Sequence, residues 1–129
     1  MNKIAIVSIS SFGRDYPEHI KELEKIGPVK RFYFEKDANP EEVAEALQGY
    51  KFIIMGTFPN LDKRFFELHN DVKLIARHGI GYNNIDLESA TEKGVYVTKI
   101  PGLVERNAVA EQSVTLILAV AKRIAKADK

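Results

Sequence analysis

The stretch that decides the fold is residues 74–121, LIARHGIGYNNIDLESATEKGVYVTKIPGLVERNAVAEQSVTLILAVA. An apolar run leads into two closely spaced glycines, and a second apolar run leads into a proline–glycine turn. Short apolar runs that stop at such residues are typical of strands, whereas longer apolar segments are typical of helices. The stretch therefore predicts a strand, a ligand loop, a helix, a second strand and a long exit helix.

The same alternation runs back to the N-terminus. Helix starts are marked by Asn39 followed by Pro40, by Asp62 and by Asp86, which are residue types that cap a first turn. The five apolar runs predicted as strands cover residues 3–8, 29–34, 52–55, 72–76 and 95–98. Runs that are apolar on both faces, alternating with helices, indicate an α/β fold with a doubly wound parallel sheet. Five strands in this rhythm favour the flavodoxin-like order 2-1-3-4-5.

The exit helix is predicted over about residues 105–126. Its segment VTLILAVA, residues 114–121, is apolar on nearly every face. A helix that is apolar all round is normally buried. One face can lie on the sheet domain, and the other needs a second domain or another copy of the chain. The alternative is that this helix is simply the last helix of the core.

Composition limits the function classes. The chain has 129 residues, enough for one domain, and its net charge of +1 gives no electrostatic case for nucleic acid or anionic membrane. It has no cysteine, which excludes disulfides and thiolate metal sites, and its three histidines lack metal-ligand spacing. No signal peptide is recognisable, and the longest apolar run falls short of the ~20 residues that span a bilayer. We expect a cytoplasmic protein.

Chemistry is expected in the loops after the strands, because open parallel sheets bind ligands beyond their carboxyl ends. The loop at residues 77–84, RHGIGYNN, is the most informative. Its glycines let the backbone approach a ligand, so the amides of Ile80 and Gly81 suit a carboxylate. A plain glycine turn is the alternative. The loop lacks the third glycine of a dinucleotide fingerprint, and the chain has no phosphate loop and no serine-hydrolase elbow.

Two polar residues near these loops, Asn107 and His78, can each be interpreted as functional or as structural. Asn107 is expected to begin and cap the exit helix, with free N–H groups that point at the same cleft, and it is compatible with both capping and binding. His78 could act as an acid or base, but a structural or exposed histidine is the simpler interpretation. His19 and His69 are predicted to be solvated.

At these residues the chain resembles a known family. The matching marks are Arg77, Gly79, Ile80 and Gly81, followed by Asn84-Ile85-Asp86, Ala90-Thr91, Gly94, Pro101 and the run Asn107-Ala108-Val109-Ala110-Glu111. Their spacing is similar to that of the D-isomer-specific 2-hydroxyacid dehydrogenases, the phosphoglycerate dehydrogenase-like family. The rest of the chain fits the flavodoxin-like substrate domain of that family. The resemblance implies a substrate-binding domain at residues 1–104 and a linking helix at residues 105–129 that leads toward a nucleotide-binding domain absent from this chain.

The resemblance also implies a function. Such enzymes are NAD- or NADP-dependent oxidoreductases that interconvert a 2-hydroxy acid and a 2-oxo acid in a cleft between the two domains. The amides matching Ile80 and Gly81 bind the substrate carboxylate, and the residue matching Asn107 lies near the substrate and the nicotinamide. The catalytic arginine, glutamate and histidine and the dinucleotide motif belong to the other domain. We therefore expect no catalytic residue, cofactor-binding residue or metal ligand in this chain, and no turnover by it alone.

Two details qualify that expectation. The loop at residues 56–60, GTFPN, carries none of the basic residues with which phosphoglycerate-type members bind phosphate, which argues against a phosphorylated substrate. A stand-alone carboxylate-binding or protein-interaction module, homodimeric through the C-terminal helix, is the alternative function. A flavodoxin or receiver domain fits less well, because the serines after the first strand and Met55 with Gly56 stand where a receiver needs acidic residues.

Overall fold

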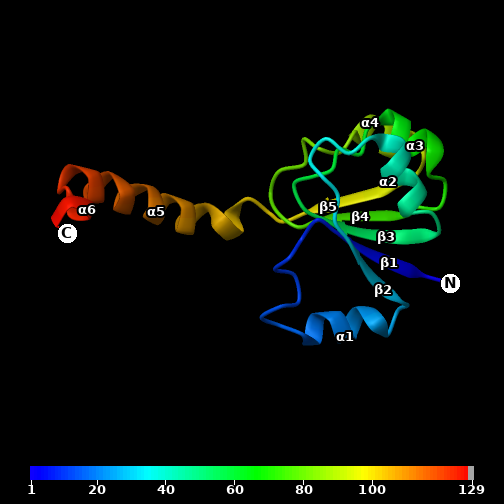
Figure 1. Ribbon diagram of the computed structural model, residues 1–129, viewed down its shortest axis with the longest axis horizontal. Coiled ribbons are helices and arrows are strands. Elements are labelled where there is room, and N and C mark those ends of the chain that lie inside the picture. The colour runs from blue at the N-terminus through cyan, green and yellow to red at the C-terminus, as the bar shows by residue number, and fades with distance from the viewer. Residues whose placement is uncertain (128–129) are drawn as a thin grey trace.

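The computed structural model describes residues 1–127 and contains a five-stranded, all-parallel sheet. The strand order is β2-β1-β3-β4-β5, so the predicted flavodoxin-like, doubly wound sheet is confirmed (Figure 1). The strands are β1 (Lys3–Val7), β2 (Val29–Phe32), β3 (Tyr50–Met55), β4 (Leu74–Arg77) and β5 (Tyr96–Lys99). Each lies within about two residues of its predicted run, the ordinary uncertainty of strand ends.

Helices lie on both sides of the sheet. Helix α1 (Glu18–Glu24) is on one side, and α2 (Pro40–Ala46), α3 (Lys63–Leu68) and α4 (Leu87–Glu92) are on the other (Figure 1). The three predicted caps are confirmed, because the side chains of Asn39, Asp62 and Asp86 accept hydrogen bonds from amides three residues on, at 2.8, 3.0 and 3.1 Å. Each cap satisfies a donor that the first helical turn leaves free.

The main core lies between the sheet and α2, α3 and α4. Side chains alternate along each strand, so Ile53 and Met55 of β3 point into this core and are at most 1% exposed. His69 also lies there, 1% exposed, and its Nε2–H donates to the Leu47 carbonyl oxygen at 2.6 Å. The prediction that His69 is solvated was wrong. The residue follows directly on α3 and its ring stacks on Phe65, which brings it beneath α2.

Helix α5 (Leu103–Ala121) extends away from the sheet domain, and α6 (Ile124–Ala127) follows it (Figure 1). None of its residues is buried. The expectation that one face of this helix lies on the sheet domain was wrong, as was the alternative of a last core helix. The predicted continuous helix to residue 126 was also wrong, because Arg123 has a φ of 52°, a left-handed conformation that interrupts it. Residues 128–129 of the predicted linking segment lie outside the described residues.

Among residues 1–127, no helix combines the length and the apolar character needed to cross a membrane.

Candidate carboxylate-binding loop

The loops that follow the strands meet at the carboxyl edge of the sheet. The rings of Phe12, after β1, and His78, after β4, pack edge to face with centroids 5.8 Å apart. The amide of Ile100, after β5, donates to the carbonyl oxygen of Gly79 at 3.0 Å. The predicted gathering of these loops is confirmed, and the loop after β4 lies between its neighbours.

Gly79 is required by the shape of this loop. Its φ is +145°, outside the range that side-chain-bearing residues adopt readily. A Cβ at this position would lie 2.6 Å from Nη1 of Arg77, which occupies the space beneath the turn. Arg77 is 6% exposed, and its Nη1 donates to the carbonyl oxygen of His78 at 2.5 Å. Gly79 therefore lets the backbone fold directly over the guanidinium group.

Gly81 is not required in the same way. The nearest protein atom to a Cβ there would be Asn83 Oδ1 at 3.6 Å, an ordinary contact, and its φ is not positive. Ile80 is half-buried and Gly81 is exposed. Neither amide donates a hydrogen bond to any group within residues 1–127. Two adjacent N–H groups without a protein acceptor are the kind of donors that backbone anion sites use.

The Arg77 guanidinium adds positive charge to this loop, where it lies against Gly79. No carboxylate in the described part of the chain forms an ion pair with it. Burial away from water lowers the pKa of Arg77 below its ordinary value, although arginine remains protonated at any physiological pH. A buried cation without a counter-ion favours a negative charge nearby. The loop is therefore suited electrostatically, as well as by its donors, to a carboxylate.

Asn84 positions this loop relative to the loop after β3. It is 6% exposed, and its Nδ2 donates to the carbonyl oxygens of Gly56 and Pro59 at 3.3 and 3.2 Å. Its Oδ1 accepts a longer bond from Arg77 Nε at 3.4 Å. Sequence reasoning used Asn84 only as a family mark and missed this role. A polar residue two positions before the Asp86 cap was the available signal, but nothing local showed which carbonyls it would reach.

Asn107 differs from expectation. Helix α5 begins at Leu103, four residues earlier, so the prediction that Asn107 begins and caps the helix was wrong. The ring of Pro101 already holds a helical φ, and the Val104 amide donates to its carbonyl oxygen at 3.1 Å. The side chain of Asn107 is exposed about one turn into α5, and no hydrogen bond connects it to the loop after β4 within the described residues. The turn before α5 does adjoin that loop, since a Cβ on Gly102 would lie 3.9 Å from Ile80 Cγ2.

The connection between β4 and α4 does not have the form of a dinucleotide-binding turn. A dinucleotide fingerprint leads from a strand through a tight turn into a helix whose N-terminus faces the pyrophosphate. Here nine residues separate β4 from α4, and the Asp86 carboxylate occupies the start of that helix. A negative charge at this position opposes a phosphate. Residues 1–127 also contain no group of three metal-ligating side chains close enough to hold an ion.

The strand order and the helices on both sides of the sheet define the class of the fold, a flavodoxin-like α/β domain. Comparison with protein families makes the assignment specific. The model of the D-isomer specific 2-hydroxyacid dehydrogenase, catalytic domain, matches residues 6–114. The chain belongs to this family.

Individual relatives support the same family assignment. The chain is 34% identical over 116 residues to a glyoxylate reductase of Thermococcus litoralis, covering 89% of this chain and 35% of the relative. It is 44% identical over 70 residues to a putative 2-hydroxyacid dehydrogenase of Staphylococcus aureus, covering 54% of this chain and 22% of the relative. The chain thus spans about a third of the length of the glyoxylate reductases it matches.

Solved structures show the same fold. An NAD⁺-bound 3-phosphoglycerate dehydrogenase of Entamoeba histolytica matches with a TM-score of 0.70 at 29% identity, over 92% of this chain and 38% of that one. D-lactate dehydrogenase of Escherichia coli matches with a TM-score of 0.76 at 24% identity, over 97% of this chain and 39% of that one, and shows the fold alone.

Proposed function

We propose that this chain is the substrate-binding domain of an NAD- or NADP-dependent oxidoreductase that interconverts a 2-hydroxy acid and a 2-oxo acid. In this proposal residues 1–104 form the domain, and the segment from residue 105 onward leads toward a nucleotide-binding domain. The bound group is the substrate carboxylate, held by the amides of Ile80 and Gly81. Asn107 contributes a polar side chain from α5 when the cleft is formed.

The observation that carries the proposal is a loop with two adjacent amides, at Ile80 and Gly81, that lack a protein acceptor, next to a buried Arg77 that has no carboxylate partner among residues 1–127. A carboxylate oxygen accepts hydrogen bonds from backbone N–H groups, and the guanidinium compensates its charge. The glyoxylate reductase and 3-phosphoglycerate dehydrogenase relatives bear names of enzymes that act on small carboxylic acids. The loop at residues 56–60 carries no basic side chain, which favours an unphosphorylated acid.

The nicotinamide cofactor would supply the hydride in the complete enzyme. In the proposal the nucleotide-binding domain supplies both the cofactor site and the acid or base for the hydroxyl proton. In the proposal this chain therefore binds and orients the acid without completing the reaction. Sustained oxidation of NADH or NADPH by the purified chain with a panel of 2-oxo acids would contradict this part.

Calorimetric titration tests the binding part. Pyruvate and glyoxylate should bind the purified chain weakly, and Gly81→Ala should weaken binding at least about tenfold by filling the space in front of the amides, a loss of about 1.4 kcal/mol. Asn60→Ala, an exposed change in the neighbouring loop, is the matched control and should bind as the wild type does. Equal binding by Gly81→Ala and wild type would show that the amides are not the site.

A second role is favoured by the exposure of α5. Eight large apolar side chains of this helix are each more than half exposed: Leu103, Val104, Val109, Val114, Leu116, Ile117, Leu118 and Val120. Surface of this kind on a soluble chain marks an association site. We propose that α5 associates with a second copy of the chain or with a partner domain. Multi-angle light scattering tests this, and a strictly monomeric chain at high concentration would contradict the homodimer.

A further inference from the structure

The loop after β1, residues 8–17, runs from the carboxyl edge of the sheet to α1 (Figure 1). Sheets with this strand order place ligands between the ends of β1 and β3, where the order of the strands reverses. Here those two ends lie close together. A Cβ on Gly56, which follows β3, would lie 2.6 Å from the carbonyl oxygen of Ser8 and 3.3 Å from Cγ1 of Ile9. The loop after β1 therefore takes up the start of this crevice.

Two sets of contacts hold the loop after β1 in place. Arg31 of β2 is half-buried, and its guanidinium donates from Nη1 to the carbonyl oxygen of Ile9 at 3.0 Å and from Nη2 to that of Phe12 at 2.5 Å. Gly13 has a φ of 72°, and a Cβ there would lie 2.5 Å from Cγ1 of Ile20 in α1. A planar guanidinium that binds two oxygens fixes their relative position. The backbone of Phe12 is therefore held at a defined place on the edge of the sheet.

Phe12 reaches the residue that precedes the glycines of the loop after β4. Its ring packs edge to face on the ring of His78, with centroids 5.8 Å apart, and its centroid is 6.2 Å from that of His19. Strand β3 lies between β1 and β4, so the contact with His78 spans the end of β3. His78 is itself fixed, since its amide donates to the carbonyl oxygen of Met55 at 2.8 Å and its carbonyl accepts from Arg77. The two rings therefore bound the loop after β4 on its β3 side.

The β5 side of the same loop is occupied by backbone. The Ile100 amide donates to the carbonyl oxygen of Gly79 at 3.0 Å, and a Cβ on Gly102 would lie 3.9 Å from Cγ2 of Ile80. The room beside the loop is therefore on the β3 side, where Phe12 lies. The substituent of a 2-oxo acid is close to its carboxylate. An acid whose carboxylate is held by this loop would direct its substituent toward the Phe12 ring.

We infer that Phe12 is a specificity-determining residue that limits the size of the substituent on the bound acid. This rests on the proposed carboxylate binding by Ile80 and Gly81 and names the acids that fit. Glyoxylate and pyruvate are accepted, whereas acids with a branched or aromatic substituent are disfavoured. The Phe12 ring does not move aside freely, because it contacts the ring of His78 and because Arg31 holds its carbonyl oxygen. Forcing a larger group against a packed side chain is unfavourable.

Titrations of the ¹⁵N-labelled chain with acids of increasing size test the inference. The amide shifts of Ile80 and Gly81 report binding at this loop, and glyoxylate, pyruvate, 2-oxoisocaproate and phenylpyruvate each give a dissociation constant. In the wild type, the two larger acids should bind at least about tenfold more weakly than pyruvate. Phe12→Ala should remove most of this difference by tightening the binding of the larger acids. Glyoxylate has only a hydrogen in place of the substituent, so its binding should not change.

Two further variants complete the experiment. Tyr16→Ala is the matched control, because Tyr16 is an exposed aromatic residue of the same loop that stacks on His19 rather than on His78, and it should leave all four constants unchanged. Phe12→Trp makes the opposite change and should weaken the binding of pyruvate about tenfold relative to glyoxylate. Circular dichroism checks that each variant folds, and Phe12→Trp decides the question if Phe12→Ala does not fold.

The outcomes separate this inference from the proposed function. Size selectivity that relaxes in Phe12→Ala and persists in Tyr16→Ala supports the role of Phe12. Equal binding of pyruvate and the larger acids by the wild type overturns that role and leaves carboxylate binding standing. Selectivity that is unchanged in Phe12→Ala, or that relaxes equally in Tyr16→Ala, also overturns it, because the limit then does not lie at the Phe12 ring. Amides of Ile80 and Gly81 that respond to none of the acids overturn both.

Discussion

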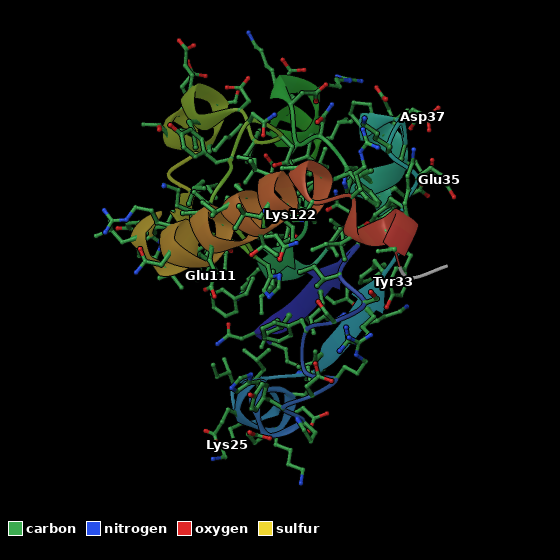
Figure 2. All side chains as sticks on the ribbon, turned by 90° about the vertical axis from the view of Figure 1, so that its left-hand side faces the viewer. Lys25, Tyr33, Glu35, Asp37, Glu111 and Lys122 are labelled. Atoms are coloured by element: carbon green, nitrogen blue, oxygen red, sulfur yellow. The ribbon has the colours of Figure 1, made fainter. Side chains whose placement is uncertain are left out.

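The sheet domain and helix α5 are both rich in apolar residues, but the domain buries these side chains and α5 exposes them. In the domain, side chains such as Ile53, Phe65 and Ile75 are at most 1% exposed, whereas Ile117 of α5 is 67% exposed and Val120 is 78% exposed. Figure 2 shows α5 in front of the domain, with Glu111 on it and Lys122 just after its end. The core between the sheet and α2, α3 and α4 is packed within the domain, whereas α5 leaves its apolar side chains exposed.

The largest expected effect comes from the same substitution in the two regions. Ile53→Ala should lower the free energy of unfolding by about 2–5 kcal/mol, because it leaves a cavity in a packed core. Ile117→Ala should change it by less than about 0.5 kcal/mol at concentrations where the chain is monomeric. Urea denaturation followed by circular dichroism measures both. Similar losses would mean that α5 packs on its own domain, contrary to the structure.

The next largest effect concerns the two glycines in the loop after β4, which adjoins the start of α5. Gly79→Ala should destabilise the domain by about 1–3 kcal/mol, since it forces a strained φ and a contact with Arg77. Gly81→Ala, two residues on, meets no close protein atom and should leave stability nearly unchanged. Thermal denaturation distinguishes the two glycines. Equal melting temperatures would show that the Arg77 guanidinium does not hold the loop.

A matched pair of asparagines extends the comparison to polar groups. Asn84→Ala removes the donors to two buried carbonyl oxygens and should cost about 1–3 kcal/mol. Asn107→Ala removes an exposed side chain of α5 with no hydrogen-bond partner and should leave unfolding unaffected, while it weakens substrate binding in the complete enzyme. Chemical denaturation gives the first result, and a large loss for Asn107→Ala would contradict the placement of α5.

The smallest effect concerns the cap of α4. Hydrogen bonds from the Ser89 amide and hydroxyl lower the pKa of Asp86 below its ordinary value. A carboxyl whose pKa is lower in the folded state stabilises that state above the unfolded pKa, near ~3.9, and loses this contribution as the pH falls through the folded pKa. The protection factors of the α4 amides, which correct for the pH dependence of intrinsic hydrogen exchange, should therefore fall below about pH 4. Asp86→Asn, which cannot titrate, should remove this dependence, and α5 has no side-chain cap to show it.

Much of the domain could be predicted from the sequence because its signals are local. The caps at Asn39, Asp62 and Asp86 depend on residues three positions apart, and strand runs depend on consecutive apolar residues. The positions of His69 and Asn84 could not be predicted, because their partners are about 20 or more residues away. The sequence predicted α5 as a helix that needs a partner. Because its apolar residues lie on nearly every side, the sequence could not predict which face would pack.

In the candidate site, too, local features could be predicted from the sequence and contacts between distant groups could not. Ile80 and Gly81 could be singled out because glycines after a strand have a local meaning, whereas the role of Arg77 beneath Gly79 required the three-dimensional fold. Asn107 was misplaced as a cap because α5 begins at Leu103, directly after the Pro101–Gly102 turn.

The central claim is that the loop after β4 binds a carboxylate through two backbone amides. It is tested most directly by ¹H–¹⁵N correlation spectra of the labelled chain, titrated with pyruvate and, separately, with its uncharged methyl ester. Saturable shifts of the Ile80 and Gly81 amides with pyruvate, and none with the ester, are the predicted result. Shifts that are the same for both compounds, or that leave these two amides unmoved while others respond, would contradict the claim.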